Sequence, residues 1–318
     1  MRGLILAAAM LAPWSASAAD PPGTITILEG EALIYRGAGR LFASEGVRLA
    51  LGDIVETAAS TFVQVELPDQ SVIQFGPATR AMLSGSAEHQ KLQRWLYVMN
   101  GWCKVAGPKA GAGSAGSVDV RSRLFDIPAN PGVVVFQVTP AEVTLFVERG
   151  DVRLAERQAS GSSIATSLKA GDYYRRKAPV RGVINPGATD TFLAEMPRSF
   201  RDSLPLRIDR YRDNEVRPRD APDFAYADVE PWLKAESWLR RPFVQRWRAK
   251  AREAAFRAAL IANLPAHLEW DPVLFPEKYL PKDPPAKRAA SASAPAPAHA
   301  PAPAPARPAG VVASPSTP

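Results

Sequence analysis

The amino-acid sequence predicts a mainly β N-terminal domain, a β-roll or β-helix-like coiled sheet, followed by a smaller α-helical region and a disordered Ala/Pro-rich tail. Three observations carry this prediction. Short alternating apolar runs separated by turn residues recur through residues 24–174. Apolar residues at helical spacing follow in residues 188–282. Residues 284–318 consist largely of Ala-Pro repeats, which have little apolar surface to bury.

Residues 1–18 have the pattern of a secretory signal peptide. Arg2 precedes a short apolar run, and small residues follow it, so that cleavage after Ala18 or after Ala19 fits equally well. The run is far shorter than the roughly 20 residues that span a bilayer. The sequence therefore predicts export to the periplasm and no transmembrane segment in the mature chain.

The β domain is built around residues 47–67, which read as strand, tight corner, strand. Gly52 and Asp53 interrupt the apolar β-formers with residue types that favour turns, and we expect Asp53 to cap the main-chain amides of its corner. Residues 24–35 form strand with a break at Gly30. Further strands are expected at residues 72–75, 81–83, 91–98, 102–105, 118–120, 133–138, 143–147 and 152–154.

Two internal echoes favour a coiled sheet over a simple meander. Leu49–Asp53 returns as Leu168–Asp172, and the Leu-x-Val run before Gly101 returns before Gly150. Asn100-Gly101 itself is typical of a hairpin or a corner. The residues expected at structural corners are Gly52, Asp53, Thr57, Gly101, Gly150, Gly171 and Asp172.

Helix signals begin near residue 188. Thr189 or Asp190 is expected to cap a short helix, and Pro197 to begin another. Residues 207–223 read as an exposed connector, after which Asp228 caps a helix that starts at Val229. A longer helix is expected at residues 248–264, with one apolar face made of Phe256, Leu260, Ile261 and Leu264.

One ordered series of glycines, aliphatic residues and turn residues runs through the β domain. Its members are Gly30 to Ile34, Leu49-x-x-Gly52-Asp53-x-Val55-x-Thr57, Phe62-Val63-Gln64-Val65-x-Leu67-Pro68-Asp69-x-Ser71-x-Ile73, Leu83, Gly101, Gly150 with Val152, and Leu168-x-Ala170-Gly171. This series resembles the FecR domain, the periplasmic sensing part of the ferric citrate regulator proteins. The resemblance covers about residues 24–174 and does not reach the helical region.

The resemblance implies a β-rich domain outside the cytoplasmic membrane without catalytic activity. In the regulators that name the family, an anti-sigma segment lies inside the cell, and the outer domain receives a signal from an outer-membrane receptor. Here a cleavable signal stands in place of the cytoplasmic anti-sigma and transmembrane segments. Arg121 and Phe125 keep a family motif in which Ser122 and Arg123 replace glycine and threonine.

Neither a metal site nor a catalytic constellation is predicted. His89, His267 and His299 are far apart in the sequence and lack metal-ligand spacing. Cys103 is the only cysteine, so it cannot form a disulfide within the chain. We expect its side chain to be buried and to pack as a small hydrophobic group. Glu66 is expected on the solvated end of a strand. The sequence predicts a non-enzymatic protein with no cofactor.

The most distinctive polar feature is a group of tryptophans and arginines in the helical region. Such residues dominate protein interfaces, but buried tryptophans covered by arginine side chains are the favoured alternative. The residues of this possible partner or polymer surface are Trp238, Arg240, Arg241, Arg246, Trp247 and Arg248.

Two functions follow from the sequence. The first is a periplasmic binding and regulatory module that engages an envelope protein, such as an outer-membrane receptor, in signalling. The second is a cell-wall or polysaccharide-associated protein that binds an anionic polymer, which the net charge of +7 would favour. Nucleic acid is not expected as a partner, because the chain lacks a basic segment interleaved with stacking aromatics. The oligomeric state stays open.

Overall fold

The structure is a computed structural model that describes residues 22–88, 91–108, 118–130 and 132–280. The predicted signal peptide and the Ala/Pro-rich tail lie outside the described residues, as does most of the loop expected at 107–117. The chain divides into two compact units, Met1–Pro276 and Glu277–Pro318. In the described part of the chain, no helix has the length and apolar character needed to cross a membrane.

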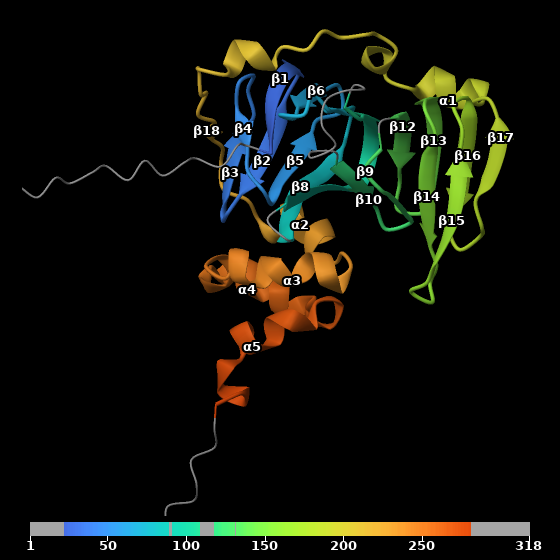
Figure 1. Cartoon of the computed structure of the whole chain (residues 1–318). Coiled ribbons are helices and arrows are strands. Elements are labelled where there is room, and N and C mark those ends of the chain that lie inside the picture. The colour runs from blue at the N-terminus through green and yellow to red at the C-terminus, as the bar shows by residue number, and fades with distance from the viewer. Residues whose placement is uncertain (1–21, 89–90, 109–117, 131, 281–318) are drawn as a thin grey trace, which may run out of the picture. The chain divides into compact units, whose positions relative to one another are not determined.

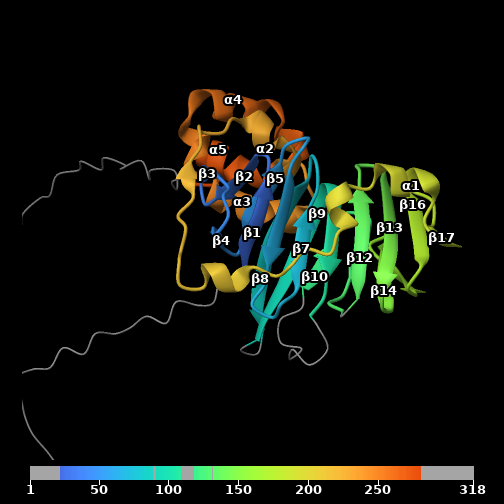
Figure 2. The same ribbon diagram turned by 90° about the horizontal axis from the view of Figure 1, so that it is seen from above.

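The β domain consists of two curled sheets that share one long strand, β9 (Lys91–Ala106) (Figures 1 and 2). Sheet A is antiparallel throughout, and its spatial order is β4 (Arg48–Leu49), β1 (Gly23–Glu29), β6 (Phe62–Glu66), β7 (Val72–Phe75), β9, β12 (Val133–Val138), β13 (Glu142–Arg149), β16 (Asp172–Lys177) and β17 (Val183–Pro186). Sheet B has the order β18 (Arg219–Asp220), β3 (Gly39–Phe42), β2 (Ala32–Arg36), β5 (Asp53–Thr57), β8 (Arg80–Glu88), β9, β10 (Val118–Arg121), β11 (Phe125–Ile127), β14 (Val152–Arg157) and β15 (Ser163–Leu168). Only the β9–β10 pairing of these is parallel. The predicted fold, a mainly β domain followed in the sequence by a helical region, is confirmed.

Strand β9 passes from sheet B to sheet A at Gly101. Its first part pairs with β8, and Gly101 onward pairs with β12. Gly101 has φ +103°, a conformation that side chains rarely tolerate. A Cβ at this position would lie 2.4 Å from Cα of Thr79. The sequence predicted either a hairpin or a corner at Asn100-Gly101. The structure has the corner, and it lies inside one continuous strand.

A network centred on Thr57 and Thr79 fixes this crossing. The hydroxyl of Thr57 donates to the Gly76 carbonyl (2.6 Å) and accepts the main-chain N–H of Thr79 (2.8 Å). The hydroxyl of Thr79 in turn donates to the carbonyl of Trp102 and accepts its N–H, at 2.9 and 3.1 Å. Both threonines are buried. The expected corner residue Thr57 thus ties β5 to the crossing.

The main core lies between the two sheets, because alternate residues of each strand point inward. Val63 and Val65 of β6 face Leu83 of β8 and Leu96 of β9 across this core, and all four are at most 1% exposed. Cys103 is also in this core, as the sequence predicts.

The echoed corners have the same geometry. Gly52 and Gly171 have φ of +87° and +90°, and the carboxylates of Asp53 and Asp172 each accept a main-chain N–H three residues back, at 2.7 Å. The Arg36 guanidinium also donates three charge-assisted hydrogen bonds to the Asp53 carboxylate, the shortest 2.6 Å. The capping role predicted for Asp53 is confirmed.

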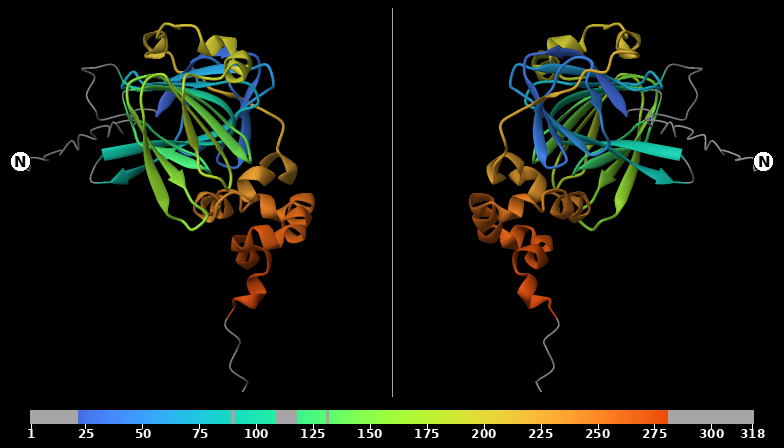
Figure 3. Two further views of the ribbon diagram at one scale, coloured as in Figure 1. Left: turned by 90° about the vertical axis from the view of Figure 1, so that its right-hand side faces the viewer. Right: turned by 90° about the vertical axis from the view of Figure 1, so that its left-hand side faces the viewer.

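Both outer faces of the sheets are covered by helical segments (Figure 3). On sheet B, side chains of Tyr35, Ile54, Met82 and Tyr97 contact a second apolar cluster contributed by the C-terminal helices. These are α2 (Tyr226–Leu233), α3 (Ser237–Arg246), η3 (Lys250–Arg252), α4 (Ala254–Ala262), η4 (Leu264–Ala266), η5 (Leu268–Trp270) and α5 (Asp271–Leu274), before η6 (Pro276–Lys278). On sheet A, the covering elements are α1 (Asp190–Glu195) and η1 (Arg198–Phe200), with η2 (Ile208–Tyr211) further along.

Three sequence predictions for the helical region need correction. The helix α2 begins at Tyr226, and Asp228 lies in its first turn, where it accepts the Ala225 N–H. The helix expected at 248–264 is instead η3 and α4, because the chain leaves helical geometry at Glu253. Ile261 is 41% exposed and lies off the buried face. Thr189 is confirmed as the cap of α1.

Glu66 is also placed differently from the prediction, because it is fully buried rather than solvated. Its carboxylate accepts the hydroxyl of Thr26 (2.7 Å) and the main-chain N–H groups of Arg207 (2.8 Å) and Ile208 (3.0 Å). The connector at 207–223 is therefore held on sheet A by a carboxylate whose oxygen atoms are bonded to donors.

Replacing Gly101 by alanine should destabilise the protein more than replacing Gly171 by alanine. Both residues have positive φ, so each substitution carries about 1–3 kcal/mol of backbone strain. Only Gly101→Ala adds a collision with Thr79, since nothing lies within 4 Å of a Cβ at Gly171. Urea unfolding of the two variants measures the difference, and equal midpoints would contradict the close packing at the crossing.

Candidate functional site

A groove lies on the outer face of sheet B, beside α3. We call it the Trp groove and define it by Leu51, Met82, Trp95, Trp238 and Pro242. It encloses about 330 Å³. The Trp95 and Trp238 rings meet edge to face, with centroids 5.7 Å apart. A strand, a corner and a helix from distant parts of the sequence therefore form one aromatic wall.

Strand alternation explains why Trp95 faces the groove. Leu96 and Val98 point into the core between the sheets, so Trp95 and Tyr97 point outward. The helices bury Tyr97 but leave Trp95 half-buried. Trp238 is 39% exposed and Leu51 is 43% exposed. Large apolar side chains exposed together in a concave place are typical of a binding site.

Arginine side chains lie over both tryptophans. The guanidinium of Arg121 is 5.4 Å from the Trp95 ring, and that of Arg157 is 5.6 Å from the Trp238 ring. Arg157 also binds the Asp126 carboxylate through two contacts of 2.6 and 2.7 Å. Although burial opposes the charge of Arg157, the hydrogen bond that it donates to the Asp126 carboxylate raises the pKa of Arg157. Arg157 therefore stays charged, and each of the two guanidinium groups lies over one tryptophan ring.

A second, charged hollow lies on the other side of Trp238. It encloses about 910 Å³, and its charged lining includes Arg123, Asp126, Arg157, Arg176 and Glu236. The Tyr97 hydroxyl donates to Glu236 at 2.6 Å, and burial together with that carboxylate raises the pKa of Tyr97. Trp238 is therefore a wall shared by an apolar groove and a charged hollow.

The six residues expected to form one surface are separated by the fold. Trp238 lines the groove, and Arg240 forms an ion pair with Glu269 at 2.9 Å. Arg241 on α3 and Arg248 in the turn after α3 are both exposed. Trp247 is fully buried and stacks on Phe243, with ring centroids 4.4 Å apart.

Arg246, the sixth residue, attaches α3 to the Gly52 corner. Its guanidinium donates to the main-chain carbonyls of Gly52 (2.6 Å), Gly37 (2.8 Å) and Tyr35. Burial lowers the pKa of Arg246 to about 10. Trp247 donates its indole N–H to the same Gly37 carbonyl at 3.1 Å. These bonds position the end of α3 that bounds the groove.

Of the expected corner residues, only Gly52 and Asp53 line the groove. Thr57 and Gly101 lie together at the β9 crossing, as described above. Gly150 turns the chain from β13 into β14, and Gly171 with Asp172 forms the echoed corner before β16. These last three build the scaffold away from the groove.

Sequence reasoning missed Leu51, Trp95, Arg121 and Arg157 as site residues. A signal for Trp95 was present, because it alternates with the apolar residues Leu96 and Val98 and must occupy the opposite face of its strand. The arginines carried no such signal, since their stacking partners come from other strands or from α3.

The described residues contain no group of three or more His, Cys, Asp or Glu side chains that could hold a metal ion. His267 is buried next to the Tyr226 hydroxyl, at 3.1 Å, and burial lowers its pKa. Burial raises the pKa of the Cys103 thiol. His89 and His299 lie outside the described residues.

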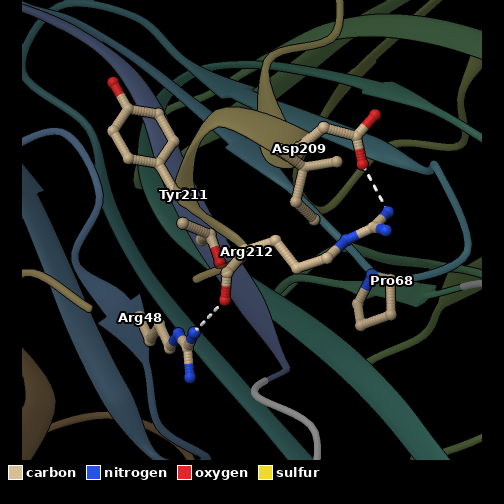
Figure 4. Close-up of a pocket in the computed structure, with 7 residues that line it drawn as sticks. Arg48, Pro68, Asp209, Tyr211 and Arg212 are labelled. Atoms are coloured by element: carbon tan, nitrogen blue, oxygen red, sulfur yellow. Dashed lines mark hydrogen bonds and ion pairs between the residues drawn. The ribbon is translucent and has the colours of Figure 1, made fainter. Parts of the chain in front are cut away.

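Another hollow, of about 360 Å³, lies where η2 meets the first strands (Figure 4). Arg48 donates to the main-chain carbonyl of Arg212 at 2.8 Å, and Arg212 forms an ion pair with Asp209. Asp209 and Arg212 are 80% and 74% exposed. Such exposed pairs contribute little energy, and this hollow lacks the apolar lining of the Trp groove.

No family model and no curated protein matches the chain. Two crystal structures from Parabacteroides distasonis ATCC 8503, each described as a "putative anti-sigma factor", are similar to part of it, with 13% and 12% sequence identity. Each covers 44% of this chain, with a TM-score of 0.36. The chain spans 62% and 63% of those two chains. A likeness of this size assigns no function.

Removing the Arg246 side chain should loosen α3 from the sheet. Arg246→Ala leaves carbonyl acceptors at Tyr35, Gly37 and Gly52 without this donor, which should lower the free energy of unfolding by about 2–3 kcal/mol. Arg241→Ala, on the exposed face of the same helix, should change it by less than about 0.5 kcal/mol. Chemical denaturation of both variants tests this, and similar losses would show that Arg246 is no anchor.

Proposed function

We propose that this protein is a non-enzymatic binding module of the cell envelope that holds an apolar segment of a partner protein in the Trp groove. The observation that carries the proposal is the pair of partly exposed tryptophans, Trp95 and Trp238, each under an arginine, at the mouth of an apolar hollow. Aromatic and arginine side chains around a desolvated pocket are typical of interface hot spots.

The lining of the groove favours a protein over a polysaccharide. Leu51, Met82, Leu239 and Pro242 offer aliphatic surface with few hydrogen-bonding groups, whereas a sugar would need polar partners for its hydroxyls. The nearby arginines also already have acceptors, because Arg36 binds Asp53 and Arg157 binds Asp126. An anionic polymer would have to compete with these carboxylates, while an apolar side chain would not.

The sequence favours a cellular location and a biological role for this binding activity. The signal-peptide pattern of residues 1–18 favours the periplasm, and the FecR-like series of corners favours a regulatory role in envelope signalling. The geometry of the echoed corners at Gly52 and Gly171 is compatible with that resemblance. An envelope protein, such as an outer-membrane receptor, is the partner we propose, without direct anti-sigma activity in this chain.

Site-specific photo-crosslinking in cells tests the proposal. A photoreactive phenylalanine analogue at position 238 should give a defined protein adduct, and Leu51→Asp should abolish that adduct by placing a charge in the groove. The same analogue at Ser167, an exposed position on β15, is the matched control and should give no such adduct.

The identified partner should then bind the purified chain, with at least tenfold weaker affinity for Leu51→Asp, a loss of about 1.4 kcal/mol. Co-sedimentation with peptidoglycan covers the alternative polymer function. Binding to peptidoglycan that Trp238→Ala removes, without any protein adduct, would replace this proposal with a cell-wall function.

A further inference from the structure

Strand β17 ends sheet A with an uncovered apolar edge. Among the described residues it pairs with β16 and with no other strand. Val183 and Ile184 are 57% and 42% exposed, and Val180, just before the strand, is 65% exposed. An apolar edge strand is a template for pairing with another chain unless it is covered. The opposite edge strand of sheet B, β15, instead exposes Ser163, Ala165 and Ser167.

A row of core side chains crosses sheet A and ends at this edge, where no strand lies beside the last side chain of the row among the described residues. The strand registers place Phe136 beside Leu145, Leu145 beside Tyr174, and Tyr174 beside Ile184. The first three are 0% exposed and belong to the core between the sheets, whereas Ile184 is 42% exposed. One further strand would cover Ile184 as each strand before it covers its neighbour.

The main chain of Ile184 is open to a new strand. The Gly187 N–H donates to the Gly171 carbonyl at 2.8 Å. In an antiparallel pair every second residue bonds to the neighbouring strand, so this bond shows which residues of β17 bond to β16. By that alternation Val183 and Asn185 turn their polar groups toward β16, and Ile184 turns its N–H and C=O away. Pro186 has no N–H and limits the added pairing to a short stretch.

The exposed charges at the start of β17 are positive, whereas Asp172 lies opposite Pro186 at its end. Lys177 and Arg181 are exposed, and Arg175 is 59% exposed, although it pairs with Glu142. Glu156 is buried, where it lies 3.7 Å from Arg176 and accepts the Gly182 N–H. An acidic segment would therefore be attracted to this edge.

From these observations we propose that β17 is a strand-addition site for an extended segment of a partner protein that alternates apolar and acidic residues. Main-chain hydrogen bonds to Ile184 would supply the docking geometry, as in other complexes that extend a sheet. An apolar side chain of the segment would cover Ile184, and its carboxylates would face Lys177 and Arg181. This surface is separate from the Trp groove and does not depend on it.

Short synthetic peptides test the site on the purified full chain. A peptide of alternating valine and glutamate should bind in fluorescence anisotropy, and a matched peptide of alternating valine and lysine should bind at least about fivefold more weakly. Amide NMR shifts should centre on Ile184. Equal binding of the two peptides, or shifts centred on Trp95 and Trp238, would overturn the proposal.

Two kinds of variant separate pairing from charge. Ile184→Pro removes the outward N–H without removing a bond to β16, and should weaken binding of the acidic peptide at least about fivefold. Lys177→Glu with Arg181→Glu leaves the backbone intact and should do the same, while Arg252→Glu, exposed on η3, should not. Thermal unfolding of each variant checks that the sheet is intact.

The remaining outcomes distinguish this site from the groove. Leu51→Asp alters the Trp groove but not the edge at β17, so it should leave binding of the acidic peptide unchanged. A failure of the groove proposal would therefore not count against β17. Unchanged peptide affinity in both the proline and the double-glutamate variants would overturn the strand-addition site. A dimer in analytical ultracentrifugation that Ile184→Pro dissociates would also overturn it, because the occupant would be a second copy.

Discussion

The hydrogen-bonded contact between Thr57 and Thr79 at the Gly101 crossing holds the two sheets together as one scaffold. The long strand β9 leaves sheet B and enters sheet A at this point, and the main chain of Thr79 lies where any side chain at Gly101 would have to go. Because the threonine hydroxyls bond main-chain groups of Gly76 and Trp102, the turn before β8 and the second half of β9 are tied to β5. Strand β8 pairs with β9 before the crossing, and β12 pairs with β9 from Gly101 onward.

Each outer face of this scaffold is closed by a helical segment, and each closure uses a different chemistry. On sheet B the closure combines apolar packing with donors from Arg246 and Trp247 to main-chain carbonyls of the turns at Gly37 and Gly52. On sheet A the buried carboxylate of Glu66 accepts the main-chain N–H groups of the connector. Glu66 is fully buried and Arg246 is partly buried, and in both places fixed hydrogen-bond partners replace the hydration of the charged group.

The two proposed binding surfaces lie where these closures end. The helices bury Tyr97 but stop short of covering Trp95, so an apolar groove opens beside α3. On sheet A the α1 segment covers Tyr173 on the outer face, but no described strand follows β17 at the edge. The groove presents side chains and the edge presents a main-chain ladder, so they suit different modes of recognition.

Residue patterns alone determined much of the local structure: the strands at 72–75 and 133–138, the capping role of Asp53, the corner at Gly171 and Asp172, and a helix cap at Thr189 or Asp190. Positive φ at glycine, the alternation of inward and outward side chains along a strand, and capping all depend on residues close together in the chain. They can therefore be predicted from the sequence. Only the tertiary structure decided that Glu66 is buried, that Trp247 rather than Trp238 is core, and that Trp238 meets Trp95 and Arg157 rather than the arginines of its own helix. Those outcomes depend on which strands the chain brings under α3 and under the connector, and side chains that meet across such distances leave no periodic mark in the sequence.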